Sequence, residues 1–332
     1  MASDHNEEMI AFNDLPSPAL VALPEWGVMV ARGQDARSFL HGQLTQDIQH
    51  LQPGQCRLAG YCSAKGRLMA TLLVWSNRPD EVFLASSADV LPGLAKRLSL
   101  FVLRADCKLQ VLDVPVHGSW RLKADSAAPA AAPWSVQTDE RDGSVSIRLP
   151  EVGSVIRTLH VGSKSPAEAA PTNHALDLWR ALEVCSGIPR VVARTQDQFV
   201  PQMVNWELVG GVNFQKGCYP GQEVVARSQY RGTLKRQSFL FRLEDEATEV
   251  SVSPGDEVYA KDDPEQPAGM VVLSAPAWLG SNRSPAGCWA LIEVKWAALQ
   301  SSDATLHLGS ALGPRLLRMD LPYDIPLPEL QA

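Results

Sequence analysis

The residues best suited to chemistry lie between residues 201 and 227, where glycines surround a single cysteine. Cys218 has a cation two residues before it, Lys216, and a proline two residues after it, Pro220. Proline favours the first position of a helix, and Glu223 suits a first helical turn. The pattern predicts a helix that starts at Pro220, with Cys218 at or beside its N-terminus. Free backbone N–H groups and a nearby ammonium favour a thiolate, so Cys218 is a candidate reactive thiol and Lys216 its candidate partner.

Two considerations leave the reactivity of this cysteine open. A small cysteine in a glycine-rich bend is often buried and inert. Nucleophilic catalysis also needs a base, and no histidine lies close to Cys218 in the sequence. His41 and His174 could serve only if the fold brings one of them to the thiol.

The cysteines show no spacing typical of a metal or cluster site. No two of them form a C-x-x-C pair. We expect most to be buried thiols that pack as small apolar groups, and we expect the protein to hold no metal or cluster of its own. The six are Cys56, Cys62, Cys107, Cys185, Cys218 and Cys288.

The charge of the chain argues against direct binding of nucleic acid. The net charge is −7, from 37 acidic and 30 basic side chains, whereas a protein that neutralises many phosphates carries a basic surface. The stretch from Arg227 to Arg236 is a local exception with four basic groups and no acid. A solvated surface and a site for an anion, such as the carboxylate tail of a ligand, are both compatible with it.

The sequence also shows no sign of membrane insertion or export. No apolar stretch approaches the ~18 residues of a membrane-spanning helix. The first ten residues, MASDHNEEMI, lack the basic and apolar regions of an export signal. We therefore expect a cytoplasmic protein that does not bind a membrane.

Short apolar runs, separated by glycine, proline and aspartate turns, must position these residues. Their periodicity predicts helices over residues 36–44, 91–100 and 175–184, with Asp35 as the cap of the first. A glycine-containing turn over residues 63–67 predicts a β-hairpin. After Lys235 the chain shows only short strand-like runs with glycine and proline turns, which predicts a small C-terminal β-barrel.

These elements predict an α+β protein with a β-barrel at its C-terminal end. No glycine-rich strand–helix fingerprint of a dinucleotide-binding fold occurs. We expect a flexible tail over residues 1–17, a core over 18–236, a barrel over 237–320 and an extended tail over 321–332. Within the core, an Ala- and Pro-rich loop is expected near residues 124–137.

The segment around Cys218 resembles the K-G-C-Y-x-G-Q-E motif of the YgfZ family, whose members are relatives of the glycine-cleavage T-protein. It reads Lys216, Gly217, Cys218, Tyr219, Pro220, Gly221, Gln222 and Glu223, with Arg227 following in the family's order. Residues 39–48, FLHGQLTQDI, are similar to the family's F-x-x-G-Q-x-T-x-D segment. Residues 64–67 resemble its K-G-[RK] turn, and residues 187–189 its G-[IF]-P. The matches span roughly residues 20 to 240.

The resemblance implies an aminomethyltransferase-like fold, in which two interleaved α+β subdomains and the barrel surround a central channel. Tetrahydrofolate binds in that channel in the family, so tetrahydrofolate or a one-carbon derivative is the implied cofactor. Trp26 and Trp179 stand where the family places tryptophans against folate, and flat indole faces suit a pterin ring. Packing in the core is the alternative for each.

Two departures from the related aminomethyltransferases bear on activity. Those enzymes carry an acidic pair just after the Gly66 turn, where this chain has Ala70 and Thr71. Without a carboxylate there, acid–base work on an aminomethyl group loses its agent, so we do not expect glycine-cleavage activity. Family members also often carry a glutamate two residues before Gly187, where this chain has Cys185. A pterin anchor must therefore come from elsewhere.

The resemblance implies a folate-binding accessory protein for assembly or repair of iron–sulfur enzymes, including one that thiolates tRNA. Its partners would be folate and, transiently, iron–sulfur enzymes or assembly proteins. The second possibility is a folate-dependent one-carbon transferase that acts on an unknown amine. The third is a folate-binding scaffold in which Cys218 is structural.

Overall fold

A computed structural model describes the protein at residues 20–123, 131–162, 173–230, 234–243, 251–277, 287–300 and 305–326. The expected tail over residues 1–17 lies outside this part of the chain. So do residues 124–130 of the Ala- and Pro-rich loop and residues 327–332 of the C-terminal tail. Three residues of the basic stretch, 231–233, are also outside it.

The N-terminal sheet has five antiparallel strands in the order β3-β4-β5-β2-β6. Successive side chains point to opposite faces, and the central strands β4, β5 and β2 are largely buried on both, whereas β6 at the edge is largely exposed. On one face, Met29 and Ala31 pack with apolar residues of two helices, and on the other, Val28 joins the central core. The strands are β2 (Trp26–Arg32), β3 (Cys56–Cys62), β4 (Leu68–Arg78), β5 (Glu81–Ser87) and β6 (Lys108–Leu112), and the helices are α1 (Ala36–His41) and α2 (Leu91–Val102).

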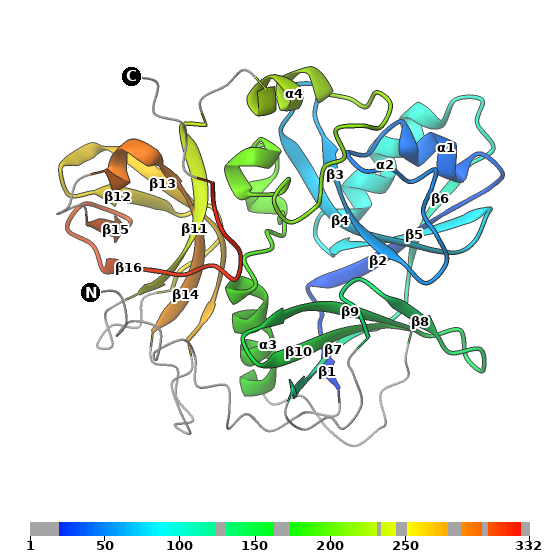
Figure 1. Cartoon of the computed structure of the whole chain (residues 1–332), viewed down its shortest axis with the longest axis horizontal. Coiled ribbons are helices and arrows are strands. Elements are labelled where there is room, and N and C mark those ends of the chain that lie inside the picture. The colour runs from blue at the N-terminus through cyan, green and yellow to red at the C-terminus, as the bar shows by residue number, and fades with distance from the viewer. Residues whose placement is uncertain are drawn as a thin grey trace.

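The middle sheet takes one strand from before the N-terminal sheet and the others from after it. Its order is β1-β7-β10-β9-β8, and Val21 of its first strand pairs with Gly118. The two sheets are therefore interleaved along the chain, and they lie one above the other in Figure 1. The strands are β1 (Val21–Ala22), β7 (Val116–Leu122), β8 (Val136–Thr138), β9 (Val145–Val152) and β10 (Val155–Val161).

The C-terminal part is a closed barrel of six strands in the order β11-β14-β13-β12-β15-β16. Closure leaves no free sheet edge, which allows a small all-β unit to bury its own core. The predicted class, α+β with a C-terminal barrel, is confirmed. The strands are β11 (Arg236–Leu243), β12 (Glu257–Ala260), β13 (Asp263–Pro276), β14 (Cys288–Lys295), β15 (Leu306–Leu308) and β16 (Arg315–Met319).

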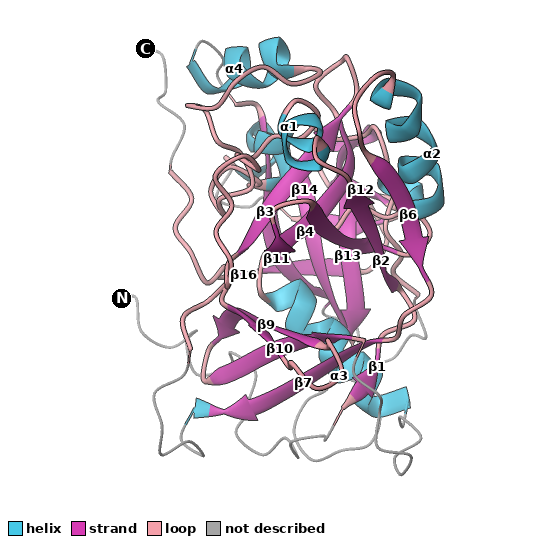
Figure 2. Cartoon of the chain, turned by 90° about the vertical axis from the view of Figure 1, so that its right-hand side faces the viewer, coloured by secondary structure: helices cyan, strands magenta, loops and turns pink. Residues whose placement is uncertain are grey.

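Two further helices connect these units. The long helix α3 (Asn173–Cys185) lies between the barrel and the middle sheet (Figure 1). The short helix α4 (Gln222–Tyr230) lies at the same end of the molecule as α1 in both views (Figures 1 and 2). Among the described residues, 3-10 helices include Ala193–Thr195, Pro201–Val204 and Trp296–Leu299. None of the helices in the described part of the chain is long and apolar enough to cross a membrane.

The structure corrects two predicted helix boundaries. The first helix ends at His41 rather than near residue 44, and Asp35 makes no side-chain cap. Its carboxylate instead accepts a hydrogen bond from the backbone of Asp106 at 2.8 Å, because the β6 segment returns beside it. The helix after the cysteine begins at Gln222 rather than Pro220. Cys218 therefore precedes it by four residues and does not lie at its N-terminus.

The chain beyond the barrel packs on the core over residues 321–326, which we call the C-terminal strap. The hydroxyl of Tyr323 donates to the carbonyl of Gly187 at 2.7 Å and accepts from the amide of Asn205 at 3.2 Å. Gly187 permits this approach, since a Cβ there would lie 2.6 Å from the Leu321 side chain. The first half of the expected tail is therefore fixed by specific contacts.

Candidate functional site

An apolar cavity lies where the two sheets meet the end of α3. Leu58, Leu73 and Leu149 come from the facing sheets, and the backbone after Gly187 closes another side. Three indoles contribute large aromatic faces. The lining residues are Trp26, Leu58, Thr71, Leu72, Leu73, Trp134, Leu149, Arg157, Glu183, Ser186, Ile188, Pro189, Arg190 and Trp206.

A buried ion pair forms the polar side of this cavity. The guanidinium of Arg190 donates to both carboxylate oxygens of Glu183, at 2.7 and 3.0 Å, and to the hydroxyl of Ser87 at 3.0 Å. Burial by itself would lower the pKa of Arg190, yet the charge and hydrogen bonds of Glu183 raise it. Arg190 also lies over the Trp26 ring, 5.1 Å from its centroid. The ion pair therefore places the Trp26 ring beside the guanidinium of Arg190, whose positive charge balances the Glu183 carboxylate.

A second cation reaches the cavity from the middle sheet. Arg157 is 2% exposed, and burial lowers its pKa to about 10. Its guanidinium donates to the carbonyl of Pro150 at 3.2 Å. The residue occupies an inward position of β10 between Val155 and Leu159, where strand alternation predicts an apolar side chain. An arginine at an inward position of a strand is the sequence signal that could have revealed this part of the site.

Position 185, where the resemblance implied a glutamate in other family members, holds Cys185, and the carboxylate of this helix comes from two residues earlier. Cys185 is buried in the core and does not line the cavity, whereas Glu183 does. Thr71 stands at the cavity wall where the related enzymes have an acid, and its hydroxyl accepts a hydrogen bond from the backbone of Val191 at 2.9 Å. Ala70 is buried on the opposite side of β4, under the helices. Sequence reasoning missed Glu183, Arg190 and Arg157.

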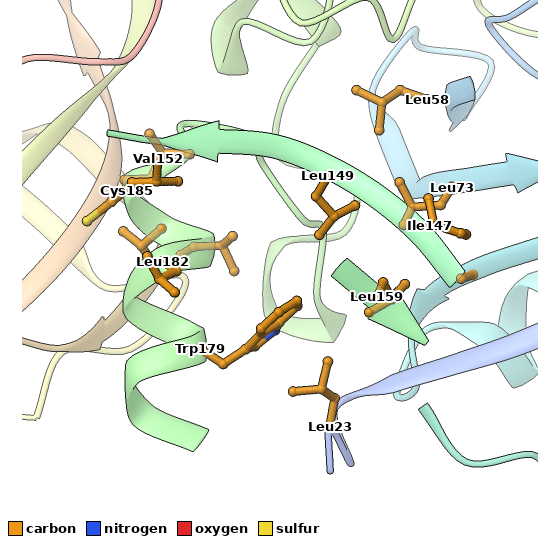
Figure 3. Close-up of a cluster of buried hydrophobic side chains, with 14 of the residues drawn as sticks. Leu23, Leu58, Leu73, Ile147, Leu149, Val152, Leu159, Trp179, Leu182 and Cys185 are labelled. Carbon is orange, nitrogen blue, oxygen red and sulfur yellow. The ribbon is translucent and has the colours of Figure 1, made fainter. Parts of the chain in front are cut away.

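The two tryptophans expected at the ligand have different surroundings. Trp26 lines the cavity and its ring nitrogen is buried, with no acceptor among the described residues. Trp179 is 1% exposed and packs against Gly118, where a Cβ would lie 2.4 Å from its ring. Figure 3 shows its indole pointing from α3 into the core near Leu159. Trp179 is not among the residues that line the cavity.

Cys218 is the exposed member of the six cysteines, all of which the structure describes. Burial raises the pKa of the Cys62 and Cys288 thiols to about 12 and that of Cys107 to about 11. Burial also raises the pKa of Cys56 and Cys185. Cys218 is therefore the thiol open to reaction, but it does not line the cavity.

Lys216 is directed at the end of α1. Its ammonium donates to the carbonyl of Leu44 at 2.9 Å and to that of His41, and it lies 5.0 Å from the Tyr219 ring centroid. Burial lowers the pKa of Lys216 to about 8, although the charges of Asp47 and Cys218 act to raise it. The lysine thus satisfies two carbonyls at the end of a helix and holds the cysteine segment in place.

Further hydrogen bonds join two motifs that lie about 170 residues apart in the sequence. The hydroxyl of Thr45 donates to the carbonyl of Gly211 at 2.6 Å, and the backbone N–H of Asn213 donates to the carbonyl of Thr45 at 2.9 Å. The side chain of Gln46 donates to the carbonyl of Gly210 at 2.8 Å. The F-x-x-G-Q-x-T-x-D segment and the cysteine segment therefore form one structural unit, which brings His41 beside Gly217.

The remaining motif residues divide between packing and solvent. Tyr219 is buried, which raises the pKa of its hydroxyl. Gly221 has a φ of +80° and lies against the 63–67 turn. Gln222 is half-buried, while Glu223 and Arg227 are exposed and form an ion pair of 3.4 Å along α4. Such an exposed pair contributes little to stability.

The same overall arrangement occurs in a solved enzyme structure. The glycine cleavage system aminomethyltransferase T from Bartonella henselae superposes with a TM-score of 0.64, over 90% of this chain and 84% of that one, at 14% sequence identity. The fold is that of an aminomethyltransferase T-protein. Two interleaved sheets followed by a closed barrel are thus a T-protein arrangement, and the cavity lies within it.

Among the relatives found by sequence is one whose function is itself uncharacterized. An uncharacterized protein from Haemophilus influenzae is 28% identical over 227 residues, which cover 68% of this chain and 73% of that protein. No family model matches the chain. Heterotetrameric sarcosine oxidase from Corynebacterium sp. U-96 matches with a TM-score of only 0.28, over 43% of this chain and 75% of that one at 15% identity. The assignment of the T-protein fold therefore rests on the Bartonella henselae structure. Membership of the YgfZ family stays a prediction.

Proposed function

We propose that this protein binds tetrahydrofolate or a one-carbon derivative in the cavity beside Trp26. We further propose that it acts as an accessory protein for assembly or repair of iron–sulfur enzymes, including one that thiolates tRNA. Cys218 is the reactive thiol in this role. The observation that carries the proposal is an aromatic cavity inside a T-protein fold, with the buried, unmatched ring nitrogen of Trp26 at its wall. Binding of nucleic acid forms no part of the proposal, because the net charge is −7.

The chemistry of the cavity suits a pteridine ring. The ring nitrogen of Trp26 is a buried donor without an acceptor among the described residues, and a buried unsatisfied donor costs about 1–3 kcal/mol. A pterin offers ring acceptors for such donors and a flat face for the indoles. Glu183 and Arg190 would supply the charged anchor that Cys185 does not.

The dimensions of the site imply adjustment on binding. The cavity volume is about 40 Å³, enough for a few water molecules but less than a bicyclic ring needs. A polar hollow of about 310 Å³ lies on the other side of the Glu183–Arg190 pair, with Glu25, Asp89 and Arg180 in its wall. Side chains between the two hollows would shift as a folate enters. The larger hollow has Arg180 and Arg190 in its wall, paired with Glu25 and Glu183, so a carboxylate-bearing tail would have to take the place of one of these acids.

A binding experiment tests the folate part of the proposal. Titration of tetrahydrofolate into the protein by calorimetry should show one site, and Trp26→Ala should weaken it about tenfold through loss of stacking. Trp179→Phe keeps an aromatic ring in the core and should bind as the wild type does. Absence of binding to wild type would refute the folate role. A loss of tetrahydrofolate binding confined to Trp179→Phe would indicate a binding site beside Trp179 on α3 instead of the cavity beside Trp26.

A cellular experiment tests the role of the thiol. A deletion strain should lose activity of iron–sulfur enzymes and thiolated tRNA bases, and Cys218→Ser should fail to restore them. Cys107→Ser, a change at a buried cysteine outside the thiol segment, is the matched control and should restore both. Normal tRNA thiolation in the deletion strain would contradict the proposal.

One observation favours the alternative, a one-carbon transferase acting on an amine. Glu183 places a carboxylate at the cavity wall, where acid–base work on an amine could occur. Both of its oxygens accept hydrogen bonds from Arg190, so an amine would have to compete with that guanidinium for them. Turnover of methylene-tetrahydrofolate with added amines, abolished in Glu183→Gln, would establish this function instead.

A further inference from the structure

Arg157 brings a positive charge into the cavity without a carboxylate of its own. The residue lines the cavity from β10 and is 2% exposed. Among the described residues, its guanidinium donates only to the carbonyl of Pro150, from Nε at 3.4 Å and from Nη2 at 3.2 Å. The ion pairs of the described residues do not include it. Its Nη1 atom therefore has no acceptor in this part of the chain.

The acid whose charge acts on Arg157 is already engaged by another arginine. Burial lowers the pKa of Arg157 to about 10, although the charge of Glu183 acts to raise it. Both Glu183 oxygens accept hydrogen bonds from Arg190, at 2.7 and 3.0 Å. The charged groups in the cavity wall are thus two guanidinium groups and one carboxylate. An excess of one positive charge remains at the wall.

The position of Arg157 in its strand makes this charge unfavourable for folding. Val155 and Leu159, two residues to either side, are fully buried in the central core. The strand partners of Arg157 are Trp120 and Leu149, which are also buried in that core. Removing a cation from water is costly unless an acceptor replaces the water. A ligand that brings an acceptor into the cavity would supply that replacement.

We propose that Arg157 determines the specificity of the cavity by donating to the 4-oxo oxygen of a pterin ring. This inference rests on the proposed folate function, and it names the ring atom that the site recognises. In tetrahydrofolate the ring nitrogens at positions 3, 5 and 8 carry hydrogen, which leaves the 4-oxo oxygen as the strongest acceptor of the ring. A buried charged donor discriminates at such an atom, because a second donor placed opposite it leaves both groups unpaired.

Two folates that differ at this ring position test the assignment. Folic acid carries the 4-oxo group, and aminopterin carries a 4-amino group, a donor, in its place. Calorimetric titration of wild type should give a Kd for aminopterin roughly 10- to 100-fold above that for folic acid. Arg157→Met should weaken the binding of folic acid and reduce this preference about tenfold. Aminopterin also lacks the hydrogen at N3, so the measure is the change in preference between variants.

Arg148→Met is the matched control. Arg148 is likewise buried in the middle sheet, but it pairs with Glu151 at 2.9 Å and does not line the cavity. This variant should keep the wild-type preference for folic acid. An equal preference in wild type and Arg157→Met would overturn the inference, while the binding of folic acid would still support the folate proposal. Absence of binding of either folate to wild type would refute the folate proposal and the inference with it.

The ligand-free protein gives a second measurement that does not depend on folate. Removing a buried charge that lacks a carboxylate partner should not weaken the fold. Arg157→Met should therefore unfold at a urea midpoint equal to or above that of wild type, whereas Arg148→Met breaks an ion pair and should unfold at a lower one. A midpoint for Arg157→Met below that of wild type, or a failure of this variant to fold, would show that Arg157 serves the fold and would overturn the inference.

Discussion

Glu207 is a carboxylic acid in a place that disfavours its charge. It follows Trp206 in the loop behind the cavity, and its Oε2 atom is buried without a partner among the described residues. Burial raises its pKa to about 7, against 4.5 for an exposed glutamate, even though backbone hydrogen bonds act to lower it. The folded protein therefore keeps a proton on this residue that the unfolded chain has released between about pH 4.5 and 7.

This difference makes the stability of the protein depend on pH. Because the folded state binds the extra proton, the free energy of unfolding should fall as pH rises from about 4.5 to 7. Each unit of pKa shift corresponds to ~1.4 kcal/mol, so the loss attributable to Glu207 amounts to about 3 kcal/mol. Glu207→Gln should remove this dependence and be more stable than wild type at pH 8. Urea denaturation at half-unit pH steps measures it.

The control for this prediction is an exposed acid of the same type. Glu140 is exposed in the turn before β9. Its variant Glu140→Gln should keep the wild-type dependence of the free energy of unfolding on pH. A variant Glu207→Gln that tracks the wild type across the range would show that the carboxylate is hydrated in solution.

At the scale of elements, the cysteine motif is held by backbone packing against a hairpin. The β3–β4 turn and Gly221 approach so closely that a Cβ on Gly221 would lie 2.3 Å from the Ser63 carbonyl oxygen. A Cβ on Gly66 would likewise lie 2.7 Å from Val224. Both glycines have positive φ, of +71° and +80°. The K-G-[RK] turn and the G-Q-E end of the cysteine motif are therefore two sides of one contact.

Gly221→Ala should disrupt this contact. The left-handed backbone costs about 1–2 kcal/mol for a non-glycine residue, and the clash with rigid backbone adds about 1–3 kcal/mol. Gly210→Ala is the matched control, since Gly210 has a φ of +85° with open space at its Cβ. Thermal and urea unfolding should show a loss for Gly221→Ala at least twice that for Gly210→Ala. Equal losses would mean that the clash relaxes without cost.

At the scale of the whole molecule, the barrel is tied to the core at two ends of its own sequence. The amide of Asn205 donates to the carbonyl of Ser238 in β11 at 2.9 Å, and it also donates to the Tyr323 hydroxyl in the C-terminal strap. The chain thus enters the barrel and leaves it at the same core residue. We expect the barrel and the core to unfold together because these contacts couple them.

Tyr323→Phe tests that coupling. It removes a hydroxyl with two hydrogen bonds, and the Gly187 carbonyl loses a donor, so we expect a loss of about 1–3 kcal/mol and a broader urea transition. Tyr230→Phe, at a side chain that is 69% exposed, should change neither. A sharp, unshifted transition in Tyr323→Phe would show that the strap does not couple the two parts.

Much of the fold could be predicted from sequence because it depends on local patterns. Two strand-like runs joined by the glycine-containing 63–67 turn predicted a hairpin, which the structure has as β3 and β4. Apolar residues at helical spacing predicted α3, and glycine and proline turns after Lys235 predicted the barrel. The resemblance to T-protein relatives added the interleaving, which no local pattern contains.

The sequence by itself determined which side chains could do chemistry, and tertiary structure decided which of them meet. Trp179 and Glu183 are four residues apart on one face of α3, roughly 6 Å along the helix. The side chain of Trp179 packs on Gly118, and that of Glu183, one turn later, lines the cavity. Likewise, nothing in the sequence places His41 beside Gly217. Such proximities depend on how segments far apart in the chain pack, and packing is fixed by shape in three dimensions.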